Sequence, residues 1–382
     1  MKKYVFVLVF FIVNLLCGQS GLYNAGVIQL HDESAIGFHG DFINDGVFDN
    51  TIGLAGFYGN RPNIVSGAIA PTFYDIEFGN LVGTFLQGSI NVVNNTNFIS
   101  GNVITTRNFE FSFLNYLTDA FYVGETNTAK VFGFAAITNK SSFTFPVGDQ
   151  NQLRSLVLNS VSSNEFAQCA YFFEDPNDAP SIDDSFDRAS RARDIGAVSN
   201  NEFWILRGNV TSSITISWNL NSNLGQLTED ITNIRVVAWN IATSRWVILG
   251  ETEKGGDINE GFITTDNFLP NEYGALTFGS TIEAQELLEL DNYFLSPNAD
   301  GINDTLVIEG MEQSPNNILN IYNRQGQRVF EMTNYTNEFT GISNQNNFVL
   351  NREIGLPEGI YYYTVSLLDL DLEYQGFLYL DR

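Results

Sequence analysis

Side chains that could bind a metal ion cluster near the C-terminal end of the 382-residue chain. Asn298, Asp300, Asn303 and Asp304 place four oxygen-bearing side chains around Gly301. Calcium loops space such ligands at alternate positions, with a glycine at the tight turn. The distal glutamate of an EF-hand is missing here, and short Asn and Asp side chains also cap their own backbone in Asx-turns. The cluster is a candidate calcium site with an Asx-turn network as the alternative, and we expect no other cofactor.

Groups that could perform catalysis are few and scattered. His31 and His39 are the only histidines, and their spacing does not match a pair of metal ligands on one helix. The sequence contains no Gly-x-Ser-x-Gly elbow, no phosphate-binding loop and no Cys-x-x-Cys pair. A glycosidase needs only two carboxylates, but nothing singles out a pair among the 44 acidic residues. We therefore expect no catalytic residues and no enzyme activity.

The first residues have the pattern of a secretory signal peptide. Lys2 and Lys3 precede an apolar run from Tyr4 to Cys17, and small or polar residues follow at once. This run is shorter than the roughly 20 apolar residues that span a bilayer. Cys17 could be lipidated only if a small residue preceded it, and that position is occupied by Leu16. The pattern predicts a signal peptide over residues 1–18, with a membrane anchor and a lipoprotein as alternatives.

Charge and cysteine content limit the partners and the sources of stability. The net charge of −26 repels phosphate backbones and anionic lipid, so we expect no nucleic-acid partner. After removal of the signal peptide, Cys169 is the only cysteine, and an intramolecular disulfide is excluded. Cys169 begins an apolar run that ends at Phe173 and is expected to be a packed thiol. Stability must therefore come from burial of apolar side chains.

An all-β fold must position these residues. Short runs rich in Val, Ile, Phe and Tyr alternate with Gly, Asn and Asp, and no segment keeps a helical period. Within residues 21–140, Tyr23–Val27 is followed twenty positions later by the similar Ile43–Val47. Such a period suits a β-solenoid, because Asn and Gly tolerate the left-handed conformation at the corners. A β-sandwich with similar hairpin turns is the alternative for this module.

Residues 141–281 form the second expected module. Alternating runs at Ile214–Trp218 and Ile234–Trp239 predict an immunoglobulin-like β-sandwich. All four tryptophans lie in this module, where they could form its core or a surface that stacks on sugars. They are Trp204, Trp218, Trp239 and Trp246. Residues 282–290 are expected to be a linker.

Residues 291–382 are expected to form a third module, a small β-sandwich. Leu319–Tyr322 alternates in polarity, Arg324–Gln327 reverses the chain, and Gly359–Leu367 is a long strand. The last strand, Tyr374–Leu380, ends next to Arg382. We therefore expect the C-terminus at one end of a sheet, where a receptor could reach it.

Four motifs follow one another in this module: Phe294–Asp304, Ile321–Gly326, Leu356–Tyr363 and Gly376–Arg382. In this order they resemble the gliding-motility-associated C-terminal domain, the type B sorting domain of Bacteroidetes type IX secretion substrates, over about Tyr293–Arg382. The candidate sorting residues are Ser296, Pro297, Asn298, Asp300, Gly301, Asn303, Asp304, Asn323, Arg324, Gly326, Pro357, Gly359, Tyr361, Gly376 and Arg382. Ala299 departs from the family, which usually has Gly there. If that position needs a positive φ, alanine strains the loop by roughly 1 kcal/mol.

The resemblance implies a route and partners. The signal peptide would bring the chain to the periplasm, and the type IX translocon would recognise the folded C-terminal domain and deliver it to the outer-membrane surface or the extracellular space. Family members often work with a β-barrel outer-membrane protein of the PorP/SprF type. Many are adhesins or accessory proteins of gliding cells.

We expect a non-catalytic surface protein that supports adhesion or gliding motility, either alone or bound to another surface adhesin. The alternative is a secreted glycan-binding or glycan-cleaving protein that carries the same tag.

Overall fold

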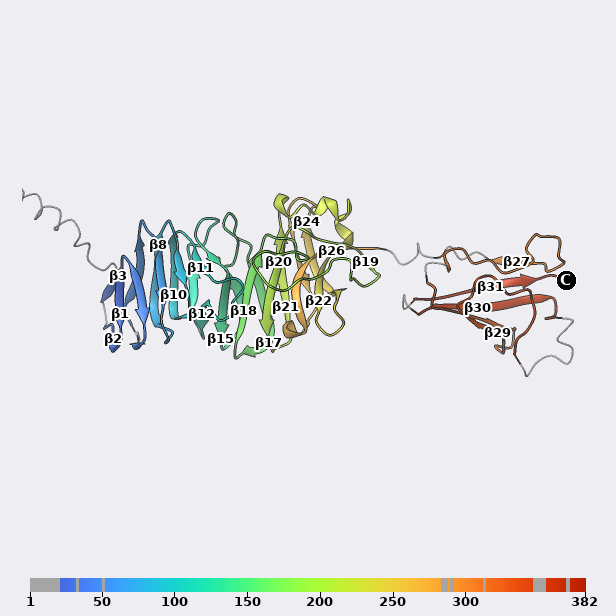
Figure 1. The fold of residues 1–382 in the computed structure, drawn as a ribbon, viewed down its shortest axis with the longest axis horizontal. Coiled ribbons are helices and arrows are strands. Elements are labelled where there is room, and N and C mark those ends of the chain that lie inside the picture. The colour runs from blue at the N-terminus through green and yellow to red at the C-terminus, as the bar shows by residue number, and fades with distance from the viewer. Residues whose placement is uncertain are drawn as a thin grey trace, which may run out of the picture. The chain divides into compact units, whose positions relative to one another are not determined.

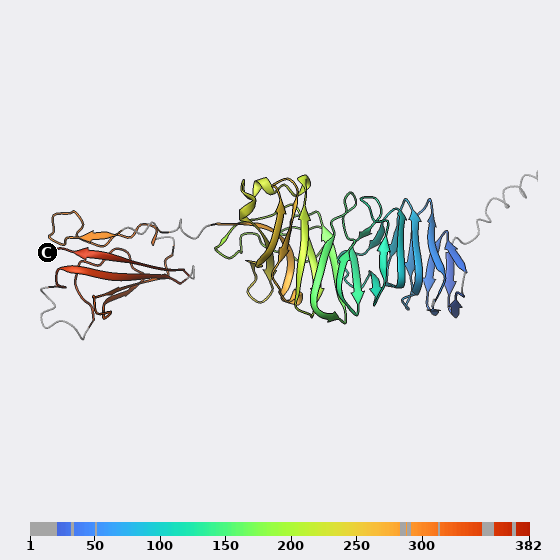
Figure 2. The same ribbon diagram turned by 180° about the vertical axis from the view of Figure 1, so that it is seen from behind.

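The computed structural model describes residues 21–31, 34–49, 52–282, 288, 292–311, 314–345, 355–368 and 372–382. Their regular secondary structure is almost wholly β-strand, and they form two compact units, unit 1 up to Ile282 and unit 2 from Glu283 onward (Figure 1, Figure 2). Within the described part of the chain, no helix is long and apolar enough to cross a bilayer. The expected signal peptide over residues 1–18 lies outside the described residues, and so does the expected linker apart from Ile282 and Leu288.

Unit 1 begins with a β-solenoid whose rungs stack in parallel register. Its first face is a six-stranded sheet of β1 (Gly21–Asn24), β4 (Asp41–Asn44), β7 (Asn63–Ser66), β9 (Thr84–Leu86), β11 (Val103–Thr105) and β14 (Val131–Phe132). The second face contains β2 (Val27–Gln29), β5 (Val47–Asp49), β8 (Thr72–Asn80), β10 (Ile90–Ser100), β12 (Phe113–Leu117) and β15 (Phe134–Thr138). Three more strands, β3 (Ala35–Phe38), β6 (Leu54–Gly59) and β13 (Phe121–Val123), extend this sheet around the solenoid.

The Asn-x-Gly repeat lies at the corner between the first two faces. Asn24 pairs in register with Asn44, and Val27 pairs with Val47. The Asn24 side chain donates to Asn44 Oδ1 at 2.7 Å and to the Val47 carbonyl at 3.1 Å. Stacked amides of this kind satisfy polar groups that would otherwise be buried without partners. The twenty-residue period and the solenoid expected from it are confirmed.

The glycines of this repeat serve a different purpose from the expected left-handed turn. Gly26 and Gly46 do not have a positive φ. A Cβ on Gly46 would lie 2.2 Å from the Gly26 carbonyl oxygen. Glycine is required there because successive rungs approach more closely than any side chain allows.

Phenylalanine rings fill the interior of the solenoid. Phe57, Phe78 and Phe98 stand on adjacent strands, with consecutive ring centroids 5.8 and 6.1 Å apart. All three are at most 2% exposed. Inward aromatic residues on every rung therefore build one continuous core along the stack.

The rest of unit 1 is a β-sandwich. One sheet adds β18 (Ala167–Phe172), β20 (Phe203–Gly208), β26 (Tyr273–Thr281), β22 (Ile234–Asn240) and β23 (Arg245–Ile248), with β19 (Ile195–Val198) beside β26. The other contains β16 (Lys140–Phe145), β17 (Leu156–Asn164), β21 (Ser212–Trp218), β25 (Gly261–Thr265) and β24 (Glu251–Gly256). The short 3₁₀ helices η1 (Leu220–Ser222), η2 (Leu224–Gln226), η3 (Ile231–Asn233) and η4 (Pro270–Glu272) lie in its connections.

Solenoid and sandwich share one sheet. β15 pairs in parallel with β12 of the solenoid and antiparallel with β18 of the sandwich. The boundary expected between residues 140 and 141 falls inside β16, and both expected modules lie in one compact unit. Main-chain hydrogen bonds continue across it.

Three tryptophans belong to the sandwich core. Trp204 and Trp218 come from opposite sheets and pack edge-on against Phe278, with ring centroids 5.7 and 5.8 Å apart. Trp204, Trp218 and Trp246 are at most 1% exposed, which excludes them from a surface that stacks on sugars. Cys169 is also fully buried, and burial raises the pKa of its thiol well above the usual value, as fits a packed thiol.

Unit 2 contains a five-stranded sheet with the order β27-β31-β30-β28-β29. Its strands are β27 (Tyr293–Leu295), β28 (Asn317–Tyr322), β29 (Arg328–Thr333), β30 (Gly359–Leu367) and β31 (Leu372–Leu380). β27 runs parallel to β31, and the other pairs are antiparallel. Inward residues such as Leu319, Val365 and Leu378 pack against Leu306, Tyr335 and Phe339 from the irregular segments.

Candidate functional site

Strand direction brings the four sorting motifs to one end of the sheet in unit 2. β27, β28 and β31 finish at this end, and the antiparallel strand β30 begins there. The loop 296–304, the turn 323–327, the segment 355–359 and the terminal residues 381–382 all extend from these strand ends. We call this the motif end of the sheet. Motifs that are far apart in the sequence thus form one surface.

Hydrogen bonds tie the chain terminus into the motif end. The Asp381 amide donates to the Leu295 carbonyl at 2.9 Å, which continues the pairing of β27 with β31. Arg382 Nη2 donates to the Gly341 carbonyl at 2.9 Å. A Cβ on Gly355 would lie 1.7 Å from the same nitrogen, so glycine makes room for the guanidinium. The C-terminus lies at a sheet end, as expected, with its last side chain held in place.

The loop 296–304 is organised by its own Asx side chains. Asp304 accepts the amides of Ala299 and Gly301 at 2.7 and 2.8 Å, one on each carboxylate oxygen. Asp300 accepts the Ile302 amide at 2.9 Å, and this hydrogen bond lowers the pKa of the Asp300 carboxyl. The Asn298 side chain donates through Nδ2 to Asp300 Oδ2 at 2.9 Å and accepts the Asp300 amide on Oδ1 at 3.0 Å. These contacts match the Asx-turn network.

Calcium binding by Asn298, Asp300, Asn303 and Asp304 stays a prediction. In the part of the chain that the structure describes, no group of three or more His, Cys, Asp or Glu side chains could hold a metal ion. A calcium ion in this loop would need the side-chain oxygens of the two asparagines in addition to the two carboxylates. It would also compete with the backbone N–H groups of the loop for the carboxylate oxygens.

Ala299 stands in the left-handed region, with φ +64°. Gly301 in the same loop has φ +87°, and Asn303 has φ +55°. Asparagine and glycine tolerate this conformation, whereas alanine is strained there by roughly 1 kcal/mol. The loop keeps its shape through the hydrogen bonds that Asp304 accepts on either side of position 300.

The remaining motif residues shape turns and ring packing. Asn323 Oδ1 accepts the amides of Gln325 and Gln327, each at 3.0 Å, and Gly326 has φ +76° in the same turn. Tyr361 donates to the Pro357 carbonyl at 2.8 Å. A Cβ on Gly376 would lie 2.4 Å from the Tyr363 hydroxyl oxygen, so glycine admits that ring. Most motif residues at these positions therefore set backbone geometry.

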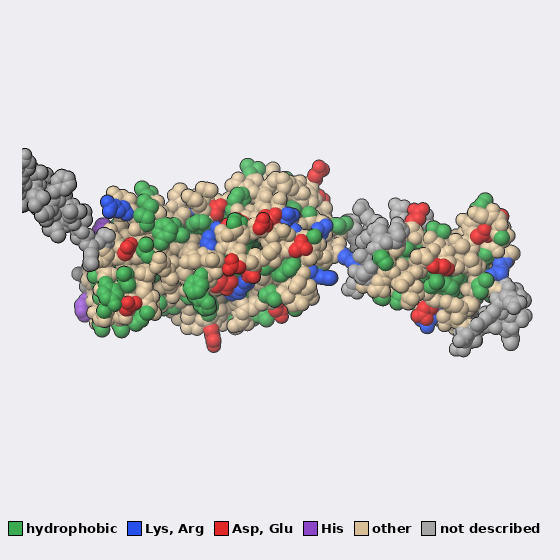
Figure 3. Space-filling model, viewed as in Figure 1, with side chains coloured by type: hydrophobic (Ala, Val, Ile, Leu, Met, Phe, Trp, Pro, Cys, Tyr) green, Lys and Arg blue, Asp and Glu red, His purple; other side chains and the backbone are tan. Residues whose placement is uncertain are grey.

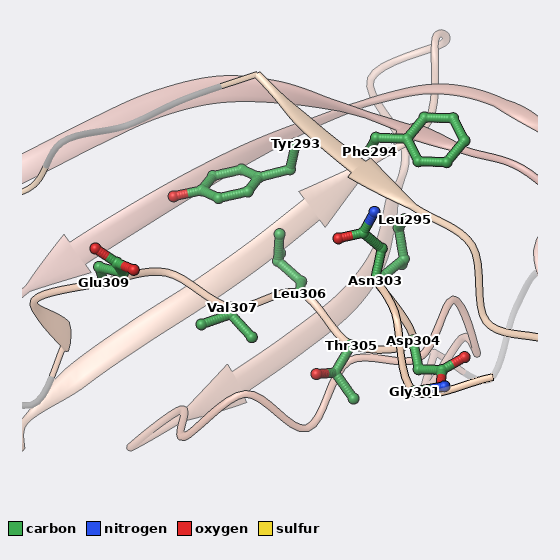
Figure 4. A pocket seen from close by; sticks show the side chains of 10 residues that line it. All are labelled: Tyr293, Phe294, Leu295, Gly301, Asn303, Asp304, Thr305, Leu306, Val307 and Glu309. Atoms are coloured by element: carbon green, nitrogen blue, oxygen red, sulfur yellow. The ribbon is translucent and has the colours of Figure 1, made fainter. Parts of the chain in front are cut away.

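A cavity of about 560 Å³ adjoins the loop 296–304 (Figure 4). Strand β27 forms one side, and the segment 303–309 forms the other. Figure 4 shows Tyr293 above and Leu306 and Val307 below, with the Asn303 amide between the two sides. The exposed Phe294 ring stacks on Tyr379, with centroids 6.0 Å apart. The sequence gives little sign of this cavity, because residues 305–309 carry no turn or charge pattern.

A second candidate site lies on unit 1, in the loop before β12. Phe109, Phe111, Phe113 and Phe166 line a hollow of about 560 Å³, which we call the phenylalanine hollow. Phe109 is 48% exposed and Phe111 73% exposed, and their ring centroids are 5.2 Å apart. The spacing Phe109-x-Phe111-x-Phe113 can be read from the sequence, but the exposure of the Phe109 and Phe111 rings depends on the geometry of the loop.

Comparison with known proteins bears on the second unit. Residues 288–380 match the model of the CHU_C Type IX secretion signal domain. No curated protein and no solved structure matches the chain. The match confirms the sorting-domain resemblance. It includes all four sorting motifs except Asp381 and Arg382, the last two residues of the fourth motif. This chain therefore carries a type IX secretion signal domain, which makes it a substrate of the type IX secretion machinery and directs it to the cell surface or the extracellular space.

Proposed function

We propose that unit 1 is a non-catalytic binding region that supports adhesion or gliding motility once the chain reaches the cell surface. The phenylalanine hollow carries this proposal. Large exposed aromatic rings are costly in water and are enriched where a protein binds another surface. Loops on a rigid β scaffold are the usual place for such contacts.

The rim of the hollow supports a binding role. Glu110 lies between Phe109 and Phe111, and one of its carboxylate oxygens pairs with Arg207 Nη2 at 3.1 Å. Its other oxygen accepts a hydrogen bond from Gln168 Nε2 at 3.2 Å. These two contacts fix the loop against the sandwich sheet. The loop that carries the Phe109 and Phe111 rings is therefore fixed before binding, which lowers the conformational entropy lost when a partner binds.

The same contacts argue for a role without catalysis. Among the described residues, Glu110 is the only carboxylate that lines the hollow, whereas hydrolysis of a glycosidic bond needs a facing pair. Because three tryptophans are in the core, the sugar-binding alternative loses most of its expected platform. The proposed role needs no cofactor. Turnover of a glycan by the purified chain would contradict it.

Replacing both exposed rings, Phe109→Ser with Phe111→Ser, is expected to reduce surface attachment or gliding while export continues. Two lost aromatic anchors weaken binding by about tenfold or more. Attachment of cells to a surface, gliding speed and antibody labelling of intact cells measure the effect. The matched control is Phe121→Ser, since Phe121 is also 48% exposed but lies outside the hollow. Equal loss in both variants would contradict the assignment.

We also propose that the motif end of unit 2 meets a β-barrel outer-membrane protein of the PorP/SprF type. The cavity beside β27 and the exposed Phe294 ring form the surface most suited to this contact. The phenylalanine hollow is separate from it and is available to a second partner, such as a surface adhesin. The two partners would thus use different units of the chain.

Phe294→Ser is expected to reduce co-purification of the β-barrel partner from outer membranes several-fold. The variant removes an apolar anchor of the cavity rim without altering a buried residue. Leu368→Ser is the matched control, because Leu368 is 51% exposed against 50% for Phe294 but follows the other end of β30. If mass spectrometry shows the same barrel captured by Phe294→Ser and by the unaltered chain, the proposal fails.

A further inference from the structure

The two ends of the solenoid differ in how they are closed. At the C-terminal end, β18 pairs with β15, and Val147 bridges to Val131. At the N-terminal end, β1, β2 and β3 each pair with one strand of the second rung and with no other described strand. Stacked repeats need a capping element at each end, because an open rung exposes both its backbone and its core.

The first rung pairs with the second through its carbonyl groups, which leaves some of its amides directed away from the solenoid. The Asp45 amide donates to the Asn24 carbonyl at 2.9 Å, and the Val47 amide donates to the Gly26 carbonyl at 2.8 Å. The residues one rung earlier are Ala25 and Val27, so their amides face the open end in the same way. Gly26 has no heavy atom within 4 Å of an added Cβ, whereas Gly46 is stacked closely on Gly26. The first rung thus offers the position that another rung would occupy.

The apolar core is also open at this end. Leu22, Ile28 and Ile36 lie in register with Phe42, Phe48 and Ala55 of the second rung. These three second-rung residues are at most 3% exposed. Leu22 is 38% exposed, and Ile28 and Ile36 are only partly buried. In the side view of Figure 3, hydrophobic side chains are also exposed on the outer surface of the N-terminal rungs. One aliphatic side chain from each strand therefore forms an uncovered apolar centre.

Charge does not protect this end. β1, β2 and β3 contain no charged residue, although the chain has a net charge of −26. The nearest described carboxylates, on Asp41 and Asp45, accept amides of the third rung, and Asp45 also interacts with the Tyr23 hydroxyl on the outer surface of β1. Asp32 and Glu33, between β2 and β3, lie outside the described residues. Edge strands usually carry a lysine, a proline or a bulge against pairing, and these three strands have none.

We propose that two copies of this chain pair end to end through their first rungs, related by a two-fold axis. A two-fold axis across the opening reverses each strand, so the free edges meet in antiparallel pairs. A single partner strand would satisfy one edge and leave two edges and the apolar centre uncovered. The hydrocarbon of a lipid bilayer has no donors or acceptors for the free edges. A second first rung supplies three edges, an apolar centre and no opposing charge.

Val27→Pro tests this pairing in the full exported chain. The variant removes an amide that faces the opening, and Val27 is 73% exposed, so the fold should tolerate it. Sedimentation of the unaltered chain should show a dimer that forms with rising concentration. Val27→Pro should weaken the dimer by about tenfold or more, because each copy loses a donor. Val27→Thr keeps both the amide and the side-chain shape and should associate as the unaltered chain does.

Hydrogen exchange locates the contact. Amides of residues 21–31 and 34–38 should become protected as concentration rises, and Val27→Pro should remove this protection while its melting temperature stays unchanged. A chain that stays monomeric up to about 100 µM overturns the proposal. A dimer that Val27→Pro leaves intact also overturns it, as does protection of this end only after a different protein is added. Pairing does not involve unit 2 or the phenylalanine hollow, so its failure would leave the proposed function untouched.

Discussion

Deleting unit 2, residues 283–382, is expected to stop surface delivery and leave the remaining chain in the periplasm. The type IX signal domain matches residues 288–380, and the motif end formed by its four motifs lies wholly in this unit. Unit 1 has its own hydrophobic cores, so the shortened chain should still fold. Protease digestion of intact cells and fractionation of the envelope measure the result. Surface protein should fall to the background of the assay.

A reciprocal fusion is the control for that deletion. Unit 2 placed after an unrelated periplasmic β protein should bring its carrier to the cell surface, because the motif end needs no contact from unit 1 to keep its hydrogen bonds. Surface delivery of unit 1 without unit 2 would contradict the sorting role. Failure of the fusion alone would indicate that unit 1 adds a signal of its own.

The sorting motifs were recognised by their resemblance to a known family, and local turn chemistry explains why short motifs can carry that resemblance. Asn323, Gly326 and Asp304 shape their turns through contacts within a few residues, so the sequence carries the signal directly. The gathering of the four motifs at one end of the sheet depends on strand order and direction. These are set by long-range pairing, which no single motif encodes.

Stacking contacts explain why parts of unit 1 were harder to predict. The period of the Asn-x-Gly repeat identified the solenoid, but the reason for Gly46 is the carbonyl of Gly26 one rung away. The pairing of β15 with β18 has no local signal in the sequence. A strand that pairs in parallel on one side and antiparallel on the other has the same residue pattern as any other buried strand. The phenylalanine hollow was missed for a similar reason, since the partial burial of Phe113 and the exposure of Phe111 follow from one loop.

Removing one partner of the buried ion pair in the sandwich should have the largest effect on stability. Glu202 is fully buried. Its carboxylate forms an ion pair with Arg154 Nη2 at 2.8 Å and accepts a hydrogen bond from the Tyr171 hydroxyl at 2.6 Å. The Arg154 side chain is 3% exposed and also donates to the Ser217 carbonyl at 2.7 Å. Glu202→Ala leaves a guanidinium charge buried without a counter-ion. Unfolding free energy should therefore fall by about 3–5 kcal/mol.

Chemical denaturation followed by tryptophan fluorescence measures this loss, because Trp204 donates to the Arg154 carbonyl at 3.1 Å and reports on the same site. Arg188→Ala is the control within unit 1. Arg188 pairs with Asp175 at 2.9 Å, but the two side chains are 35% and 31% exposed. Water screens such a pair, so its loss should cost about 1 kcal/mol or less. Equal effects from the two variants would show that Glu202 does not balance a buried charge, since burial is the main difference between the pairs.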